Sequence, residues 1–145
     1  MKYATNFLIG LALLFVSGSA LVAGVLRPRV PEAELTAARA LKNPIARTST
    51  VIARGREIYN GKGFCVACHG RDGRGISGVD PTLLKGALPT DFTDKEWQTA
   101  RADGEVMWVL KHGSSGTAMA SFVPSVLTEE EGWTPIHYLR TLVTP

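Results

Sequence analysis

The chain has 145 residues, of which 45% are hydrophobic and 20% are charged, and its formal net charge at pH 7 is +3. This length suits one domain with an appendage. The positive balance is too small to indicate a nucleic-acid partner, and we expect none.

The first element is an apolar stretch without a charge that runs from residue 7 to residue 26. At 1.5 Å per helical residue, a helix of this length spans about 30 Å, the thickness of the hydrocarbon core of a membrane. A cleaved secretory signal is the alternative, but its apolar region is usually only about 7–15 residues long. We therefore predict an uncleaved transmembrane helix over residues 7–26, within an anchor of residues 1–26.

Residues 27–47 are predicted to be a tether between this anchor and a domain of residues 48–145. Prolines near both ends of the tether break regular structure. Its middle, residues 32–42, is rich in helix formers, but Leu35 and Leu41 are the only large apolar side chains there. With so little apolar surface to bury, the tether is expected to be a solvated spacer.

The domain is predicted to begin with a helix. Hydroxyl side chains at residues 48–50 can cap its first turn, and the helix should run to about Asn60 and end at Gly61. Gly55 and Tyr59 are four residues apart and therefore share one face of this helix.

The next motif, Cys65-Val66-Ala67-Cys68-His69, is typical of covalent haem attachment. Cys65 and Cys68 lie on one helical turn and can form thioethers with the two vinyl groups of a haem, and His69 can then bind the iron. A thioredoxin-like motif would follow a strand, whereas a helix end and a glycine turn are expected here. A zinc site would need a second ligand pair at short spacing, and His112 and His137 are remote. The motif therefore predicts one covalent haem c.

The haem motif also predicts the side of the membrane on which the domain lies. The amino terminus and Lys2 before the apolar stretch nearly balance Arg27 and Arg29 after it, so the charges do not decide the orientation. Covalent haem attachment in bacteria takes place outside the cytoplasmic membrane. We expect an anchor in the bacterial inner membrane and a haem domain that faces the periplasm or another extracytoplasmic space.

Two further helices are predicted after the motif. Residues 103–113 have acidic side chains first and a glycine last, the pattern of a short helix. Thr128 and Glu131 form a capping box. Pro135 suits a first helical position, so we predict a fresh helix over residues 135–142. No alternation typical of strands is present, and the fold class is predicted to be all-α.

The order of these parts resembles class I (mitochondrial-type) monohaem cytochromes c, in a membrane-anchored bacterial form, over residues 51–142. The resemblance implies the class I cytochrome c fold around one covalent haem c. In that family the first and last helices cross at a glycine–aromatic contact, which here involves Gly55, Tyr59 and the region of Tyr138. The matching segments are Gly55 and Tyr59, Cys65-Val66-Ala67-Cys68-His69, Gly116-Thr117-Ala118-Met119, and Trp133 with Tyr138-Leu139-Arg140-Thr141-Leu142.

The resemblance implies that Met119 is the sixth iron ligand, because it lies where the family places its methionine loop. Met107 is an alternative on a helix, where it is expected to be a core residue. His112 at a helix end could also bind the iron, or the sixth position could be open, whereas His137 is expected at the surface. The family often has a proline after the methionine, whereas this chain has Ala120.

On the proximal side, the resemblance implies that the backbone carbonyl of Pro81 accepts the hydrogen of the ligating imidazole. Leu83, Trp97 and Phe122 are candidate walls of the haem pocket, although ordinary core packing explains them equally well. Arg71 and Arg74 are the candidate residues that hold the haem propionates.

An iron with His69 and Met119 as axial ligands has no free position for a substrate, and methionine favours ferrous iron. We therefore expect a one-electron carrier and not an enzyme. Its partners would be a redox protein donor and acceptor, and it would be a subunit or tethered partner of a respiratory or dehydrogenase complex. The alternative is a gas sensor or weak peroxidase, in which the iron is five-coordinate or its ligand is labile.

Overall fold

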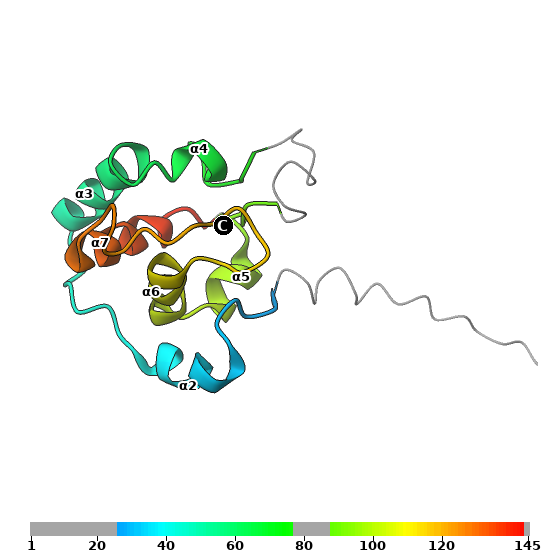
Figure 1. Cartoon of the computed structure of the whole chain (residues 1–145). Helices are drawn as coiled ribbons and strands as arrows, with labels where there is room; N and C mark the ends of the chain where they lie inside the picture. Colours follow the sequence, from blue (N-terminus) through cyan, green and yellow to red (C-terminus); the bar gives the residue numbers. More distant parts are fainter. Residues whose placement is uncertain (1–25, 77–87, 144–145) are drawn as a thin grey trace, which may run out of the picture.

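The computed structural model describes residues 26–76 and 88–143. Within these ranges the regular secondary structure is helical, as predicted, and contains no strand (Figure 1). No helix there is both long and apolar enough to cross a membrane; the helix predicted over residues 7–26 lies outside the described residues except for Leu26. The helices are α2 (Glu32–Ala40), α3 (Ser49–Asn60), α4 (Val66–His69), α5 (Lys95–Ala100), α6 (Asp103–His112) and α7 (Glu129–Leu139).

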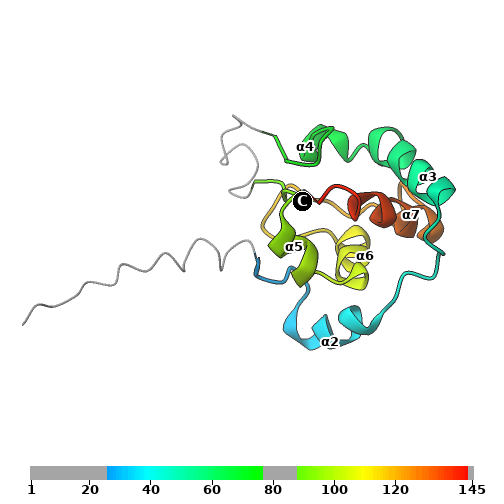
Figure 2. The ribbon, with the colours of Figure 1, turned by 180° about the vertical axis from the view of Figure 1, so that it is seen from behind.

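Helices α3 and α7 pack side by side, as Figures 1 and 2 show from opposite directions. Gly55 makes this approach possible, because a Cβ there would lie 2.7 Å from the carbonyl oxygen of Thr134 and 3.1 Å from Cβ of Tyr138. Beside this contact the rings of Tyr59 and Tyr138 meet edge to face, with centroids 5.3 Å apart. The crossing predicted from the family resemblance is present in the structure.

Helix boundaries follow local signals where these are strong. The Thr48 hydroxyl accepts a hydrogen bond from the backbone N–H of Val51 at 3.2 Å, and α3 ends at Gly61, as predicted. The capping box before α7 is also formed, since the Thr128 hydroxyl accepts from the N–H of Glu131 at 3.2 Å.

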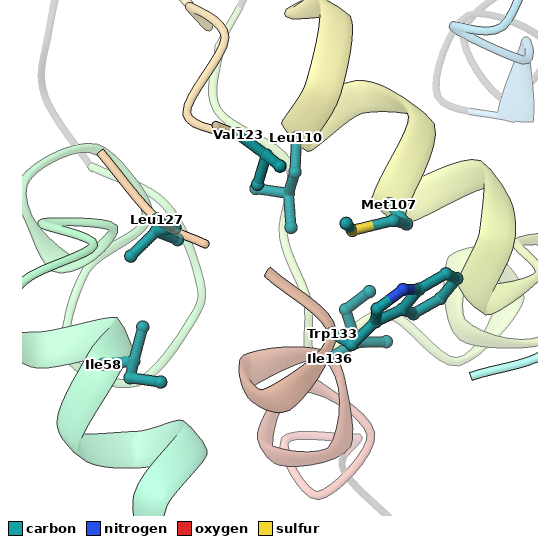
Figure 3. Close-up of a cluster of buried hydrophobic side chains, with 7 residues drawn as sticks. All are labelled: Ile58, Met107, Leu110, Val123, Leu127, Trp133 and Ile136. Carbon is teal, nitrogen blue, oxygen red and sulfur yellow. The ribbon is translucent and has the colours of Figure 1, made fainter. Parts of the chain in front are cut away.

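The largest apolar cluster lies where α3, α6 and α7 meet (Figure 3). Met107 has no exposed surface and lies beside Trp133 and Ile136 of α7, which confirms its expected place in the core. Gly132 lets α7 approach, because a Cβ there would be 3.0 Å from Cε of Met107. The cluster consists of Ile58, Met107, Leu110, Val123, Leu127, Trp133 and Ile136.

The last helix differs from the prediction. No fresh helix starts at Pro135; instead α7 is continuous from Glu129 to Leu139, with Pro135 inside it. A proline in a helix interior removes one backbone hydrogen bond and costs about 3 kcal/mol. Residues 132–139 are all buried, and Pro135 lies directly on Gly55 at the crossing. Tertiary packing of this face outweighs the local cost.

The segment before α3 also differs from the prediction, because it is not a solvated spacer. Val30, Leu35 and Ala38 are buried and pack with Trp108 of α6. Helix α2 thus lies against α6, and Gly104 provides the space, since a Cβ there would be 2.9 Å from Cβ of Leu41. Small residues at this contact allow α2 and α6 to approach closely, so few large apolar side chains are needed to pack α2 on the domain.

The connection from α2 to α3 is attached to α7 by polar contacts. Asn43 Nδ2 donates to the carbonyl oxygen of Trp133 at 3.1 Å. His137 Nε2 lies 2.8 Å from the carbonyl oxygen of Ile45. His137 is therefore buried and hydrogen-bonded, and its expected surface position is wrong.

Candidate functional site

The two thiols of the motif lie on one turn and face one cavity. A tight turn precedes them, in which Phe64 has φ of 51°. The N–H groups of Cys68 and His69 both donate to the carbonyl of Cys65, at 3.2 and 2.9 Å, so the motif forms the predicted helical turn, α4. Cys65 is half-buried and Cys68 is exposed, and both line the cavity. Burial raises the pKa of the Cys65 thiol to about 11, so this thiol is neutral at pH 7.

The cavity has a volume of about 210 Å³ and lies between α4, α5, α6, α7 and the loop after α6. Most of its wall is apolar. Trp97 and Phe122, two of the predicted wall residues, line it, whereas Pro81 and Leu83 lie outside the described residues.

His69 is fixed on one side of this cavity by two contacts. Its Nδ1 lies 3.1 Å from the carbonyl oxygen of Thr90, which can only accept, so Nδ1 carries the proton and Nε2 keeps a free lone pair. The ring also stacks on Phe92, with centroids 4.4 Å apart. Burial lowers the pKa of His69, and the hydrogen bond to Thr90 opposes this only in part, so the neutral ring is favoured.

The acceptor for His69 is thus Thr90, in the segment after Pro89, whereas the prediction assigned this role to the carbonyl of Pro81, which lies outside the described residues. A further hydrogen bond holds this segment, since the N–H of Phe92 donates to the carbonyl of Gly73 at 2.7 Å. In the sequence, Pro89 directly before Thr90 is the signal that could have identified this segment as the source of the acceptor for His69.

Met119 reaches the same cavity from the loop that follows α6. Gly113 and Gly116 have φ of 74° and 76°, a region that favours glycine, and they turn the chain back on itself. The Met119 N–H donates to the Thr117 hydroxyl at 3.1 Å, and the Ser114 N–H donates to the Met119 carbonyl at 2.9 Å. The backbone around Met119 is thus fixed without the proline that the family often has after the methionine.

The remaining candidate ligands are not at the cavity. Met107 is in the core, and His137 is bonded to Ile45. His112 is exposed and stacks on Trp108, with centroids 4.4 Å apart. Among the described residues, the cavity wall contains one histidine, His69, and one methionine, Met119.

The predicted propionate residues are also absent from the wall. Arg71 and Arg74 are exposed, and Arg74 pairs with Asp72 at 3.6 Å. The arginines that line the cavity are Arg29 and Arg101, which are far from the motif in sequence. Their positions result from tertiary packing, so motif-based reasoning missed them.

Tyr59 is a further site residue, predicted only as a helix-crossing residue. Its hydroxyl donates to the carbonyl of Gly70 at 2.7 Å, immediately after the haem motif, and its ring lines the cavity. Burial is the main cause that raises the pKa of Tyr59 well above its usual value, and the neighbouring Cys65 thiol adds to it. Tyr59 therefore remains a hydrogen-bond donor at all physiological pH values.

These donors suit a covalently attached haem. Two thiols on one turn can form the thioethers, a neutral imidazole offers Nε2, and the surrounding wall is mostly apolar. Cys65, Cys68 and His69 would hold the group, and Trp97 and Phe122 would pack against it.

Known proteins agree with this interpretation. A chain of the reducing HAO-like protein complex Kustc0457/Kustc0458 of Kuenenia stuttgartiensis is 30% identical, with a TM-score of 0.55; the match covers 70% of this chain and 47% of that one. This chain thus spans about half the length of that relative. The KustC0563 c-type cytochrome is 28% identical, with a TM-score of 0.50, over 62% of this chain and 98% of that one.

No curated protein matches the chain. The family model for cytochrome c matches residues 52–143, which include the haem motif, Met119 and α7. This match agrees with the all-helical structure and with the cavity beside the two thiols. The chain therefore belongs to the cytochrome c family and carries one covalent haem c.

Proposed function

We propose that this protein is a one-electron carrier of the class I type, in which His69 and Met119 are the axial ligands of the haem iron. The observation that carries this proposal is their common cavity: the imidazole and the thioether both line the space beside Cys65 and Cys68. With both axial positions filled, a substrate has no place to bind at the iron.

The haem supplies an iron that takes up and releases one electron, and the protein residues adjust how readily this happens. The Thr90 carbonyl orients His69 by accepting its Nδ1 hydrogen. Met119 is a soft, neutral donor and favours ferrous iron. The apolar wall disfavours the additional charge of ferric iron. These three effects all act on the reduction potential, and none of them requires a bond to be made or broken.

The contact with a redox partner is proposed at the mouth of the cavity. Phe64 and Leu88 line the cavity and are 68% and 56% exposed, so an apolar rim is accessible from solvent. The basic side chains near the motif are largely paired: Arg54 with Glu57, Lys62 with Glu131, and Arg74 with Asp72. A small, transient contact through apolar side chains fits electron transfer better than strong charge steering.

We further propose that residues 7–26 anchor the protein in the bacterial inner membrane and that the haem domain faces the periplasm. The apolar stretch and the site of haem attachment support this location. Because the segment from Leu26 to Ala40 packs on the domain, the haem domain would be held close to the membrane and would not swing on a long tether. The neighbour from an HAO-like complex supports a role within a multi-protein redox complex.

The absorption spectrum of the oxidised holoprotein tests the proposed ligation. A methionine–ferric bond gives a weak far-red charge-transfer band, which we expect in the wild type and in Met107→Leu, a control in the core. Met119→Ala should lose the band, and its reduced form should bind carbon monoxide rapidly. If the wild type lacks the band and binds carbon monoxide rapidly, the protein is a ligand-binding haem protein and the carrier proposal is wrong.

The membrane location of the protein can be tested separately by fractionating cells that produce the full chain. We expect the haem protein in the membrane fraction, released by detergent and not by salt. Release without detergent would contradict the anchor and would leave the ligation test unaffected.

A further inference from the structure

Part of the cavity wall comes from outside the region that matches the cytochrome c family. The family match begins at residue 52, yet Arg29 and Val30 line the cavity together with Arg101 and Glu105. Val30 is only 5% exposed, so this segment is packed at the cavity and does not merely pass near it.

Several contacts hold the segment of residues 26–41 in this place. The Arg101 guanidinium donates to the carbonyl of Leu26 through Nη2. Trp108 Nε1 donates to Glu34 at 2.8 Å. Arg39 Nε lies 3.4 Å from Glu105 Oε2. These contacts join residues 26, 34 and 39 to the region around α6, so the segment is fixed along most of its length.

The cavity wall carries an excess of positive charge, part of which comes from the segment. Arg29 and Arg101 line the wall with one carboxylate, Glu105, so two positive charges and one negative charge leave a net charge of +1. Arg39, which is outside the wall, pairs with the same carboxylate. Among the described residues, Glu105 is the only acidic residue in the cavity wall. A group of charges this close to an apolar cavity is stabilised by an additional anion.

Two of these arginines are available to bind such an anion. Arg29 makes no ion pair with any described residue and is exposed at the cavity wall. Arg101 is 7% exposed, and its Nη1 is 3.8 Å from Glu105 Oε1, too far for a hydrogen bond. Glu105 Oε1 accordingly has no hydrogen-bond partner within the described residues. Glu105 pairs with both Arg39 and Arg101, so one carboxylate faces two guanidinium groups.

The electrostatics of Arg101 agree with this shortage of negative charge. Burial lowers the pKa of Arg101, and Arg39 and Arg29 lower it further, against the opposing effect of Glu105. A second carboxylate beside Arg101 would oppose this shift, because a negative charge favours the charged guanidinium.

We infer that Arg29 and Arg101 bind a propionate carboxylate of the covalent haem, so that residues 26–41, outside the family domain, form part of the haem site. The guanidinium group suits this role, because its planar set of donors matches a carboxylate. The inference rests on the covalent haem and is independent of whether Met119 binds the iron.

The test uses the full-length holoprotein with Arg29→Gln, Arg29→Lys and the matched control Arg27→Gln. Arg27 is exposed, lies two residues away and does not line the cavity. The first measurement is the resonance Raman spectrum, in which the propionate bending bands report hydrogen bonds to the carboxylates. The second is the equilibrium constant for reduction by a mediator of known potential.

We expect Arg29→Gln to shift a propionate band and to lower the equilibrium constant for reduction roughly three- to tenfold, because a positive charge near the haem is lost. Arg29→Lys should shift the band as well but keep most of the equilibrium constant, since the charge remains. Arg27→Gln should match the wild type in both measurements.

If Arg29→Gln matches Arg27→Gln in both measurements, the inference is wrong, and a change in thermal stability alone would indicate only a packing role for Arg29. The far-red band is recorded for each variant. Its persistence shows that a change in potential does not come from a lost axial ligand, which separates this test from that of the proposed ligation.

Discussion

Gly55→Ala should destabilise the protein, although alanine is the better helix former. In α3 the added Cβ would lie 2.7 Å from the Thr134 carbonyl oxygen and 3.1 Å from Cα of Pro135. Both are backbone atoms of α7, so neither can move aside by changing a rotamer. The two helices must separate at the contact that joins the N-terminal and C-terminal parts of the haem domain.

The size of the effect follows from two opposing terms. Inserting a methyl group into a well-packed contact usually costs about 1–3 kcal/mol, and a clash with backbone places Gly55 near the upper end. Alanine returns about 1 kcal/mol through its higher helix propensity. We therefore expect a net loss of about 1–2 kcal/mol in the free energy of unfolding.

The assay is guanidinium unfolding of the holoprotein, followed by tryptophan fluorescence. Ala53→Gly is the matched control, because Ala53 lies on the exposed face of the same helix. It should lose about 1 kcal/mol from helix propensity alone. If Gly55→Ala instead stabilises the protein by about the amount that the control loses, the helices do not meet at this glycine and the packing argument fails.

Three further substitutions test other contacts. Gly104→Ala should push α2 away from α6, because the new Cβ meets carbonyl oxygens at the end of α2. Trypsin should then cut residues 26–47 several-fold faster than in the wild type. An unchanged rate of cleavage would contradict the packing of α2 on α6. Tyr59→Phe removes the hydrogen bond to the Gly70 carbonyl and should cost about 1–2 kcal/mol in urea unfolding; equal stability would show that this bond contributes nothing. The hydrogen bond from Lys62 lowers the pKa of Glu131 below its usual 4.5 in the folded protein. The stabilisation by this hydrogen bond is therefore complete above the pKa that Glu131 has in the unfolded chain, and it is lost as the pH falls through the lower pKa of the folded protein. The stability advantage of the wild type over Glu131→Gln should therefore shrink below about pH 4.5 in thermal melts, and a constant difference would refute this.

Local signals predicted the elements that local chemistry determines. The N-cap at Thr48, the turn that presents Cys65 and Cys68, and the glycine loop before Met119 each depend on a few neighbouring residues. The sequence was sufficient for these elements, because the capping hydroxyls, the thiol spacing and the glycines act over one or two turns.

The features that the sequence did not reveal depend on distant parts of the chain. Helix α2 has few large apolar side chains and looked solvated, but it packs closely because Ala38 and Gly104 are small. Pro135 looked like a helix start, although its burial against Gly55 keeps α7 continuous. The carbonyl of Thr90 could not be identified from the sequence as the acceptor for His69, because tertiary packing decides which carbonyl reaches the imidazole.

The proton NMR spectrum of the reduced holoprotein tests the central claim most directly. A methionine bound to ferrous haem iron lies over the ring, so its methyl resonance is shifted far upfield by the ring current. We predict one such resonance in the wild type, its persistence in Met107→Leu, and its loss in Met119→Ala. A wild type without this resonance, or a Met119→Ala variant that retains it, would contradict ligation of the iron by Met119.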